Sequence, residues 1–165
     1  MASTYEPIAT TTLGSATATI TFSSISSAYT DLRLVFVYTT NTANRTLQIR
    51  YNNDSSALYS STRLWGDGTT VTTDRNTNGT ELIVQTASTS ATIPVYFEAD
   101  IFSYAGSTYK TGLFGDAGDK NGSGQVGKCV GLWRSTSAIT AVRITAQSSY
   151  FVNGSTANLY GIAAA

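Results

Sequence analysis

Glu98 and Asp100 are the side chains of this sequence whose types and spacing come closest to a catalytic pair. Glycosidases place two carboxylates on either side of the bond that they cleave. Residues two apart in a β-strand lie on the same face, so these two carboxylates lie within several ångströms of each other. The alternation with Val95, Phe97 and Ala99 favours a simpler interpretation, in which both carboxylates face solvent opposite Arg or Lys on a neighbouring strand.

The residue inventory excludes most other catalytic chemistry. The chain of 165 residues contains no His and a single cysteine, Cys129. Ser-His-Asp and Cys-His arrangements need a His base, and zinc sites need several His or Cys ligands. Cys129 lies in an apolar run, which is typical of a small core residue. We therefore predict no catalytic residue and no cofactor, and we expect that the protein is not an enzyme.

The Gly-rich segment 115–124 raises the question of calcium. Asp116, Asp119 and Asn121 supply hard oxygen ligands, but their spacing does not match an EF-hand loop and no bidentate Glu follows. Asp and Asn beside Gly are also ordinary turn residues, which favours a plain loop without a metal. We expect Asp116, Asp119, Lys120 and Asn121 to contact a partner or a glycan, since loops commonly carry such contacts.

A second polar segment, 52–79, contains a predicted strand or hairpin around 59–65. Within it Tyr59, Arg63, Trp65 and Asp67 are the predicted contacts to a partner or a glycan. Aromatic rings such as that of Trp65 can stack on sugars, although packing in a core or an interface is the more common role. Trp133, in contrast, lies in an apolar run that predicts a buried strand.

Alternation of apolar and polar residues predicts β-strands along nearly the whole chain, and no window has helical periodicity. The abundant Thr, Val, Ile, Tyr and Phe suit strands. Pro94, near the start of one strand, predicts an edge position or a bulge. The sequence therefore predicts an all-β fold, an antiparallel β-sandwich of jelly-roll type with about eight to ten strands. The expected strands lie at about 16–22, 32–38, 47–51, 59–65, 80–87, 93–102, 108–114, 125–133, 142–146 and 156–162.

Length and charge limit the domain organisation and the classes of partner that the chain can have. A chain of 165 residues without a linker or repeat predicts one domain, 1–165. Ten basic residues balance ten acidic ones, which argues against a nucleic-acid partner, because phosphate binding needs a clustered positive surface. No apolar stretch approaches the length of a membrane span. Net charge near zero favours association with neighbouring proteins.

Several segments resemble a family of small virion proteins of tailed bacteriophages. They are YEPIA at 5–9, ITFSSI at 20–25, YSSTRLWGDG at 59–68, DIFSYAGSTYKT at 100–111, VGLWRSTSAIT at 130–140 and ANLYGI at 157–162. The resemblance covers nearly the whole chain, but its motifs are strand and turn patterns. It implies a β-sandwich that is located in the virion, on the head or on the tail.

Three functional hypotheses follow from this resemblance and from the residues. The first is a capsid decoration, or cement, protein that binds the major capsid protein and itself, with a homotrimer as the expected assembly. The second is a tail-fibre or receptor-binding tip domain that recognises host-surface glycans through the loops at 52–79 and 115–124. The third and weakest is a polysaccharide-cleaving enzyme that uses Glu98 and Asp100.

Overall fold

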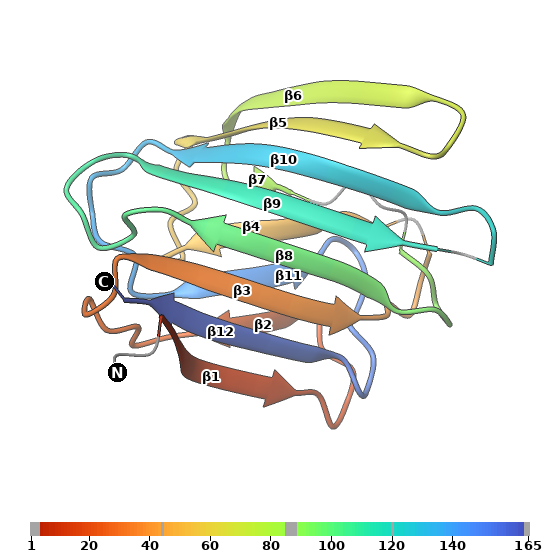
Figure 1. Cartoon of the computed structure of the whole chain (residues 1–165), viewed down its shortest axis with the longest axis horizontal. Coiled ribbons are helices and arrows are strands. Elements are labelled where there is room, and N and C mark those ends of the chain that lie inside the picture. The colour runs from red at the N-terminus through yellow and green to blue at the C-terminus, as the bar shows by residue number, and fades with distance from the viewer. Residues whose placement is uncertain (1–3, 44, 85–88, 120, 164–165) are drawn as a thin grey trace.

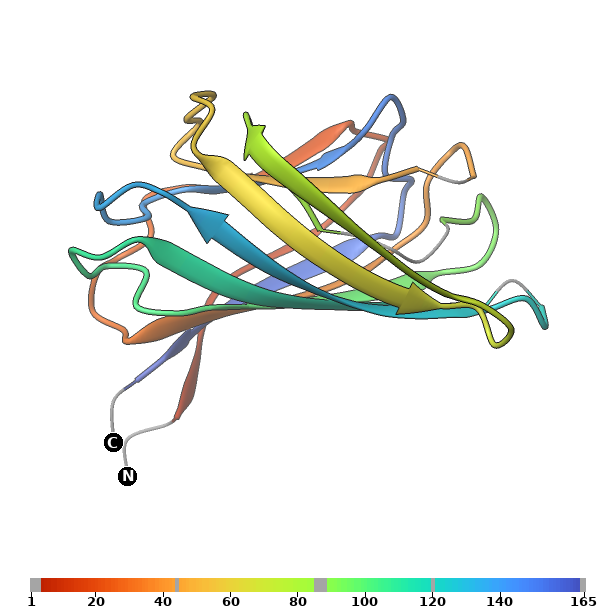
Figure 2. The same cartoon turned by 90° about the horizontal axis from the view of Figure 1, so that it is seen from above.

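The computed structural model describes residues 4–43, 45–84, 89–119 and 121–163. These residues form twelve β-strands in two layers and contain no helix (Figures 1 and 2). The strands are β1 (Tyr5–Thr12), β2 (Thr19–Phe22), β3 (Asp31–Tyr38), β4 (Leu47–Tyr51), β5 (Tyr59–Gly66), β6 (Val71–Gly79), β7 (Leu82–Ile83), β8 (Val95–Ile101), β9 (Lys110–Gly118), β10 (Gln125–Trp133), β11 (Val142–Ala146) and β12 (Thr156–Ile162).

The strands form an eight-stranded and a four-stranded antiparallel sheet. The larger sheet has the order β1-β12-β3-β8-β9-β10-β5-β6, and the smaller has the order β2-β11-β4-β7. If β1, β12 and the pair β8–β9 are left out, the remaining eight strands have the strand order of a jelly roll. In this order the chain passes repeatedly from one sheet to the other. The predicted all-β sandwich is therefore confirmed. Strands β8 and β9 are an insertion that widens the larger sheet between β3 and β10.

Alternating side chains explain why these segments form strands with one buried face. In β3, Leu32, Leu34 and Phe36 are fully buried, whereas the residues between them are partly or fully exposed. The same pattern continues in β8, whose Phe97 and Ala99 pair with β3. Residues of period two point to one side of a pleated strand, so the buried set faces the smaller sheet.

Aromatic clusters fill the space between the two sheets. Phe36 stacks on Tyr38 at a centroid distance of 4.5 Å, and Phe151 packs edge-on against Phe36 at 4.9 Å. At the other end of the core, Tyr59 stacks on Trp133 at 6.1 Å. The predictions that Trp133 and Cys129 are buried are confirmed, since their exposed fractions are 2% and 1%. Aromatic rings bury large apolar areas, so these clusters hold the two sheets together.

The structure corrects several details of the sequence prediction. The described residues form twelve strands rather than eight to ten, because β1 and β6 carry few apolar residues and were not expected. Within the expected strand at 80–87, only Leu82–Ile83 pairs as β7, and residues 85–88 lie outside the described part. The edge prediction for Pro94 is wrong: β8 lies between β3 and β9, and it begins one residue after the proline. The predicted loop at 115–124 begins only after Gly118, where β9 ends.

The close packing of side chains around Gly131 predicts that Gly131→Ala destabilises the protein. A Cβ atom at Gly131 would lie 2.8 Å from the Phe114 ring and 2.9 Å from Leu82, and both side chains are fully buried. We expect the free energy of unfolding to fall by about 1–3 kcal/mol, as for other overpacked cores. Denaturant unfolding measures this change. Gly14→Ala is the control, because nothing lies within 4 Å of its Cβ position, and it should change stability by less than about 0.5 kcal/mol.

Candidate functional site

The face of the eight-stranded sheet that points away from the smaller sheet carries most of the exposed large apolar side chains. We call it the outer face. Among the described residues, seven of the eleven exposed large hydrophobics lie on it: Val37, Leu64, Val71, Tyr96, Leu113, Val126 and Val130. No strand of the four-stranded sheet contributes to the eleven. Large exposed apolar patches are a mark of interaction surfaces, so the outer face is the candidate binding face.

Strand register aligns part of this set in a row across six strands. Val37 pairs with Tyr96, Tyr96 with Ala117, and Ala117 with Val126. Gly66 and Val71 continue the row on β5 and β6. At the usual spacing between strands, the row spans about 24 Å. We call these six residues the apolar row. It is long enough to form one side of a protein interface.

A cluster of charged residues crosses the centre of the outer face, beside the apolar row. Arg33 donates to both carboxylate oxygens of Asp100, at 2.8 and 2.9 Å, and to Glu98 Oε2 at 2.6 Å. Lys128 Nζ lies 2.7 Å from Glu98 Oε1. The interpretation that Glu98 and Asp100 face solvent opposite basic residues is confirmed. Hydrogen bonds from Lys128 and Tyr96 and the positive charges of Lys128 and Arg33 lower the pKa of Glu98, although partial burial opposes this effect.

Gly115 makes the contact between Glu98 and Lys128 possible. It lies on β9, between Glu98 on β8 and Lys128 on β10, and it pairs with both. A Cβ atom on Gly115 would lie 2.8 Å from Glu98 Oε1 and would clash with Lys128 Nζ. The ion pair therefore spans an intervening strand because that strand has no side chain there. The charges of the cluster are balanced, so the face is not strongly positive or negative at its centre.

A shallow depression of about 520 Å³ lies at the end of the outer face that carries the apolar row. The apolar part of its lining includes Val37, Tyr96 and Val126, and its polar rim includes Asp67 and Asp119. The structure thus brings together one residue from each of the two loops predicted as contact loops. The aromatic and aliphatic residues beside them were not predicted. The sequence could have revealed them by an apolar residue at an outward-facing position of an alternating strand, as for Tyr96 between Val95 and Phe97.

The loop between β5 and β6 is held by Asp67. Its Oδ1 atom accepts hydrogen bonds from the Thr69 N–H at 2.9 Å, the Thr69 hydroxyl at 2.8 Å and the Thr70 N–H at 2.7 Å. These hydrogen bonds, with that from Thr70 the strongest, lower the pKa of Asp67 to about 2. Gly68 has a φ of 90°, a conformation that favours glycine. Asp67 is therefore an ionised, fixed residue at the rim of the depression.

The loop between β9 and β10 has a similar construction around Asp119. Asp119 Oδ1 accepts a hydrogen bond from the Gly122 N–H at 2.7 Å. Asn121 is exposed and has a φ of 62°, which Asn tolerates better than most residues. The predicted contact residue Lys120 lies outside the described residues. The described part of this loop thus has the structure of an ordinary turn with its aspartate at the depression.

Four of the predicted contact residues lie within strands and do not line the depression. Tyr59 is fully buried, and its hydroxyl accepts a hydrogen bond from the Tyr51 N–H at 3.1 Å. Asp116 belongs to β9 and is 3% exposed on the inner face, because the strand continues four residues beyond the expected end at 114. Arg63 and Trp65 also face inward on β5, where the guanidinium lies 5.6 Å from the centre of the indole. Both side chains are only half-buried.

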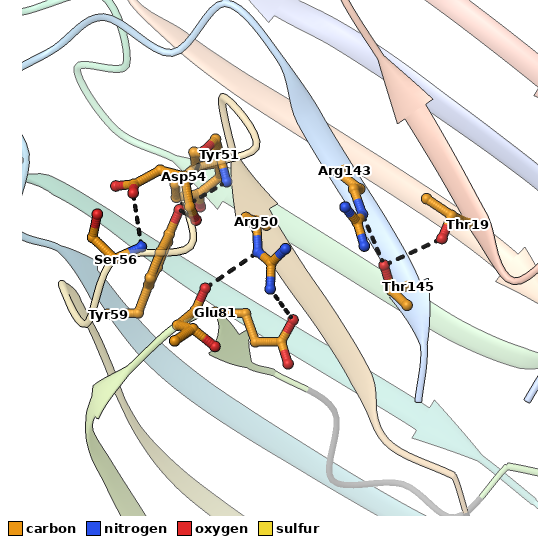
Figure 3. A network of polar contacts seen from close by, with 10 residues as sticks. Thr19, Arg50, Tyr51, Asp54, Ser56, Tyr59, Glu81, Arg143 and Thr145 are labelled. Atoms are coloured by element: carbon orange, nitrogen blue, oxygen red, sulfur yellow. Dashed lines mark hydrogen bonds and ion pairs between the residues drawn. The ribbon is translucent and has the colours of Figure 1, made fainter. Parts of the chain in front are cut away.

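The outward face of the four-stranded sheet is polar, in contrast to the outer face of the larger sheet. Figure 3 shows Arg50 on β4, which donates to the Thr80 carbonyl oxygen and to Glu81, both at 3.2 Å. On β11, Arg143 Nε donates to the Thr145 hydroxyl at 3.3 Å. These polar groups interact with one another, and no residue on the described strands of this sheet is among the exposed large hydrophobics, so the outer face is the more apolar of the two.

A search of the described residues finds no group of three or more His, Cys, Asp or Glu side chains that could hold a metal ion. In the same part of the chain, no helix is long and apolar enough to cross a membrane. Comparisons of the chain with protein-family models, with curated proteins and with solved structures found no match. The assignment of function therefore depends on the geometry of the outer face.

The hydrogen bonds to Asp67 predict that the β5–β6 loop loosens in acid. The folded pKa is lowered from 3.8 to about 2, so the contribution of the carboxylate to stability is present above pH 4 and is lost as the pH falls towards 2. An NMR titration of the Asp67 carboxyl and of the Thr69 and Thr70 amides measures this transition. In Asp67→Asn the two amide signals should not show it. A titration of Asp67 near pH 4 in the wild type would contradict the prediction.

Proposed function

We propose that the protein is a capsid decoration protein of a tailed bacteriophage, bound to the major capsid protein through the outer face of its larger sheet. The observation that carries the proposal is the concentration of seven exposed apolar side chains on this one face. A monomeric soluble protein rarely gathers so many exposed large apolar side chains on one face unless it binds something there.

Three further features support attachment by packing against a protein surface. The apolar row extends across six strands, so it suits another extended surface better than a small ligand. The central charges neutralise one another, so electrostatic attraction is not the main contribution. The jelly-roll order is common in viral capsid proteins, and several segments resemble phage virion proteins. A stable interface needs on the order of 1,000 Å² of buried area, and an eight-stranded sheet can supply its share.

The proposal predicts that a charge on the outer face weakens binding to the capsid. Val126 and Val130 are 62% and 48% exposed, so Val126→Asp and Val130→Asp should fold normally. Burial of either carboxylate in an interface is unfavourable, and we expect each variant to bind at least about tenfold more weakly. Co-sedimentation with capsids that lack the protein measures the affinity. Thr21→Asp, on the exposed face of the smaller sheet, is the control and should bind like the wild type.

Cryo-electron microscopy of the virion tests the location itself. The proposal requires density for this chain at many copies over the capsid, with the outer face against the major capsid protein. A few copies confined to the tail would overturn it, as would a capsid-bound molecule whose outer face points to solvent.

The depression favours a second candidate function, recognition of a host-surface glycan by a tail protein. Its Tyr96 ring is 39% exposed, and carboxylates at Asp67 and Asp119 can accept hydrogen bonds from sugar hydroxyls. No Lys or Arg is among the described residues that line it, which favours a neutral sugar over an anionic one. The volume of about 520 Å³ lies in the range of small-molecule sites.

The two candidate functions make different predictions for Tyr96→Ala and Trp65→Ala. If the depression binds a glycan, binding on a glycan array should be lost in Tyr96→Ala. It should be retained in Trp65→Ala, because Trp65 faces the other side of the sheet. Loss of binding in Trp65→Ala alone would contradict this assignment of the site. Absence of binding by the wild type to any neutral glycan would exclude the second candidate.

A further inference from the structure

Strand β6 leaves one edge of the eight-stranded sheet unpaired. It spans Val71–Gly79, and β5 is its only partner among the described strands. Most of its nine residues are exposed, and it contains no Pro or Lys. Long unpaired edges present a row of free N–H and C=O groups to other chains, and soluble proteins usually shorten or cover them.

The hydrogen bonds of the β5–β6 hairpin identify which groups are free. The Asp67 N–H donates to the Thr70 carbonyl oxygen at 3.3 Å, so these two residues form a hydrogen-bonded pair. Hydrogen-bonded and non-hydrogen-bonded pairs alternate along an antiparallel ladder. The main-chain N–H and C=O groups of Thr72 and Asp74 therefore point towards β5. Those of Val71, Thr73 and Arg75 therefore point away from the sheet.

The opposite edge of the sheet is protected along β1. On β1, Pro7 lacks an N–H group, and a β-bulge follows it between Pro7 and Ala9. Both features disfavour the addition of a strand. On β6 the ladder is irregular only at its far end, opposite Tyr59 and Ser61, and its first six residues (71–76) keep a regular register. The corresponding protection on β6 would be the charges of Asp74 and Arg75. Arg63 on β5 donates to Asp74 Oδ1 at 2.8 Å and compensates the charge of Asp74 within the same molecule. Arg75 Nε donates to the Thr62 hydroxyl at 3.2 Å.

We propose that β6 pairs antiparallel with β6 of a second copy, forming a two-fold symmetric dimer. The register is centred on Thr73, because centring the axis on Asp74 or Arg75 would place like charges opposite each other. Thr73 then pairs with its own copy, and Val71 pairs with Arg75 of the other chain. Three hydrogen-bonded pairs of this kind supply roughly six main-chain hydrogen bonds.

The dimer joins the two larger sheets into one continuous sheet. Its two-fold axis is perpendicular to the sheet, so both outer faces lie on the same side. A surface that binds the outer face would therefore contact two copies at once, and the linked pair would bind more tightly than one copy. The proposal does not depend on the capsid assignment, since it concerns the isolated protein.

Disulfide trapping of the purified protein tests the register. In Thr73→Cys the two thiols would lie across the axis, with Cα atoms about 5.5 Å apart, and a disulfide can form. Mild oxidation should convert most of this variant to a covalent dimer. Arg75→Cys is the matched control on the same strand, since its copies would be too far apart to link. The natural Cys129 does not interfere, because it is 1% exposed and burial raises its pKa to about 12.

Analytical ultracentrifugation tests the dimer without a cross-link. Thr73→Pro removes an N–H group that points away from β5, so the monomer should fold, as circular dichroism would show. We expect the dissociation constant of the Thr73→Pro dimer to be at least about tenfold higher than that of the Thr73→Val dimer, because Thr73→Val keeps the N–H group. A wild type that is monomeric up to about 0.1 mM, or that forms a trimer, would overturn the proposal. So would stronger cross-linking of Arg75→Cys than of Thr73→Cys.

Discussion

The burial of one face of the eight-stranded sheet against the four-stranded sheet is the constraint on which the other features depend. Leu34, Phe36 and Phe97 have no contact with solvent, and the aromatic clusters around them hold the two layers at a fixed separation. A strand side chain points to one face or the other, so this burial also determines which residues cannot be buried. Val37, Tyr96 and Val126 are exposed because their neighbours occupy the core. The candidate binding face is thus a direct consequence of the packing.

Small residues determine how the strands approach one another and what their surfaces carry. Gly131 lets Phe114 and Leu82 pack directly against the backbone of β10. Gly115 lets the side chains of Lys128 and Glu98 meet across β9. The first glycine serves the core, and the second allows a balanced charge cluster on the same face as the apolar row. Such a face can bind a partner by packing without strong repulsion or attraction over a distance.

The proposed capsid contact and the proposed dimer use different parts of the same sheet. The capsid contact involves side chains of the outer face, whereas the dimer involves main-chain groups at the edge of β6. Since the edge groups lie in the plane of the sheet, pairing there leaves the outer face accessible. The arrangement would let one molecule bind its neighbour and a capsid surface at the same time. Glycan recognition would instead require the depression at Tyr96 to stay open to solvent, which makes it an alternative to the capsid contact rather than an addition.

The sequence by itself determined the fold class, the buried positions of β3 and β8, and the surface position of Glu98 and Asp100, because period-two alternation is a local property of the chain. It did not reveal β6, whose exposed polar residues carry no such pattern, or the burial of Asp116 beyond the expected end of β9. Only the tertiary structure decided that Asp67 and Asp119 meet beside Tyr96, since this depends on strand order and register between distant segments. Register is a property of paired strands, and no single stretch of sequence contains it.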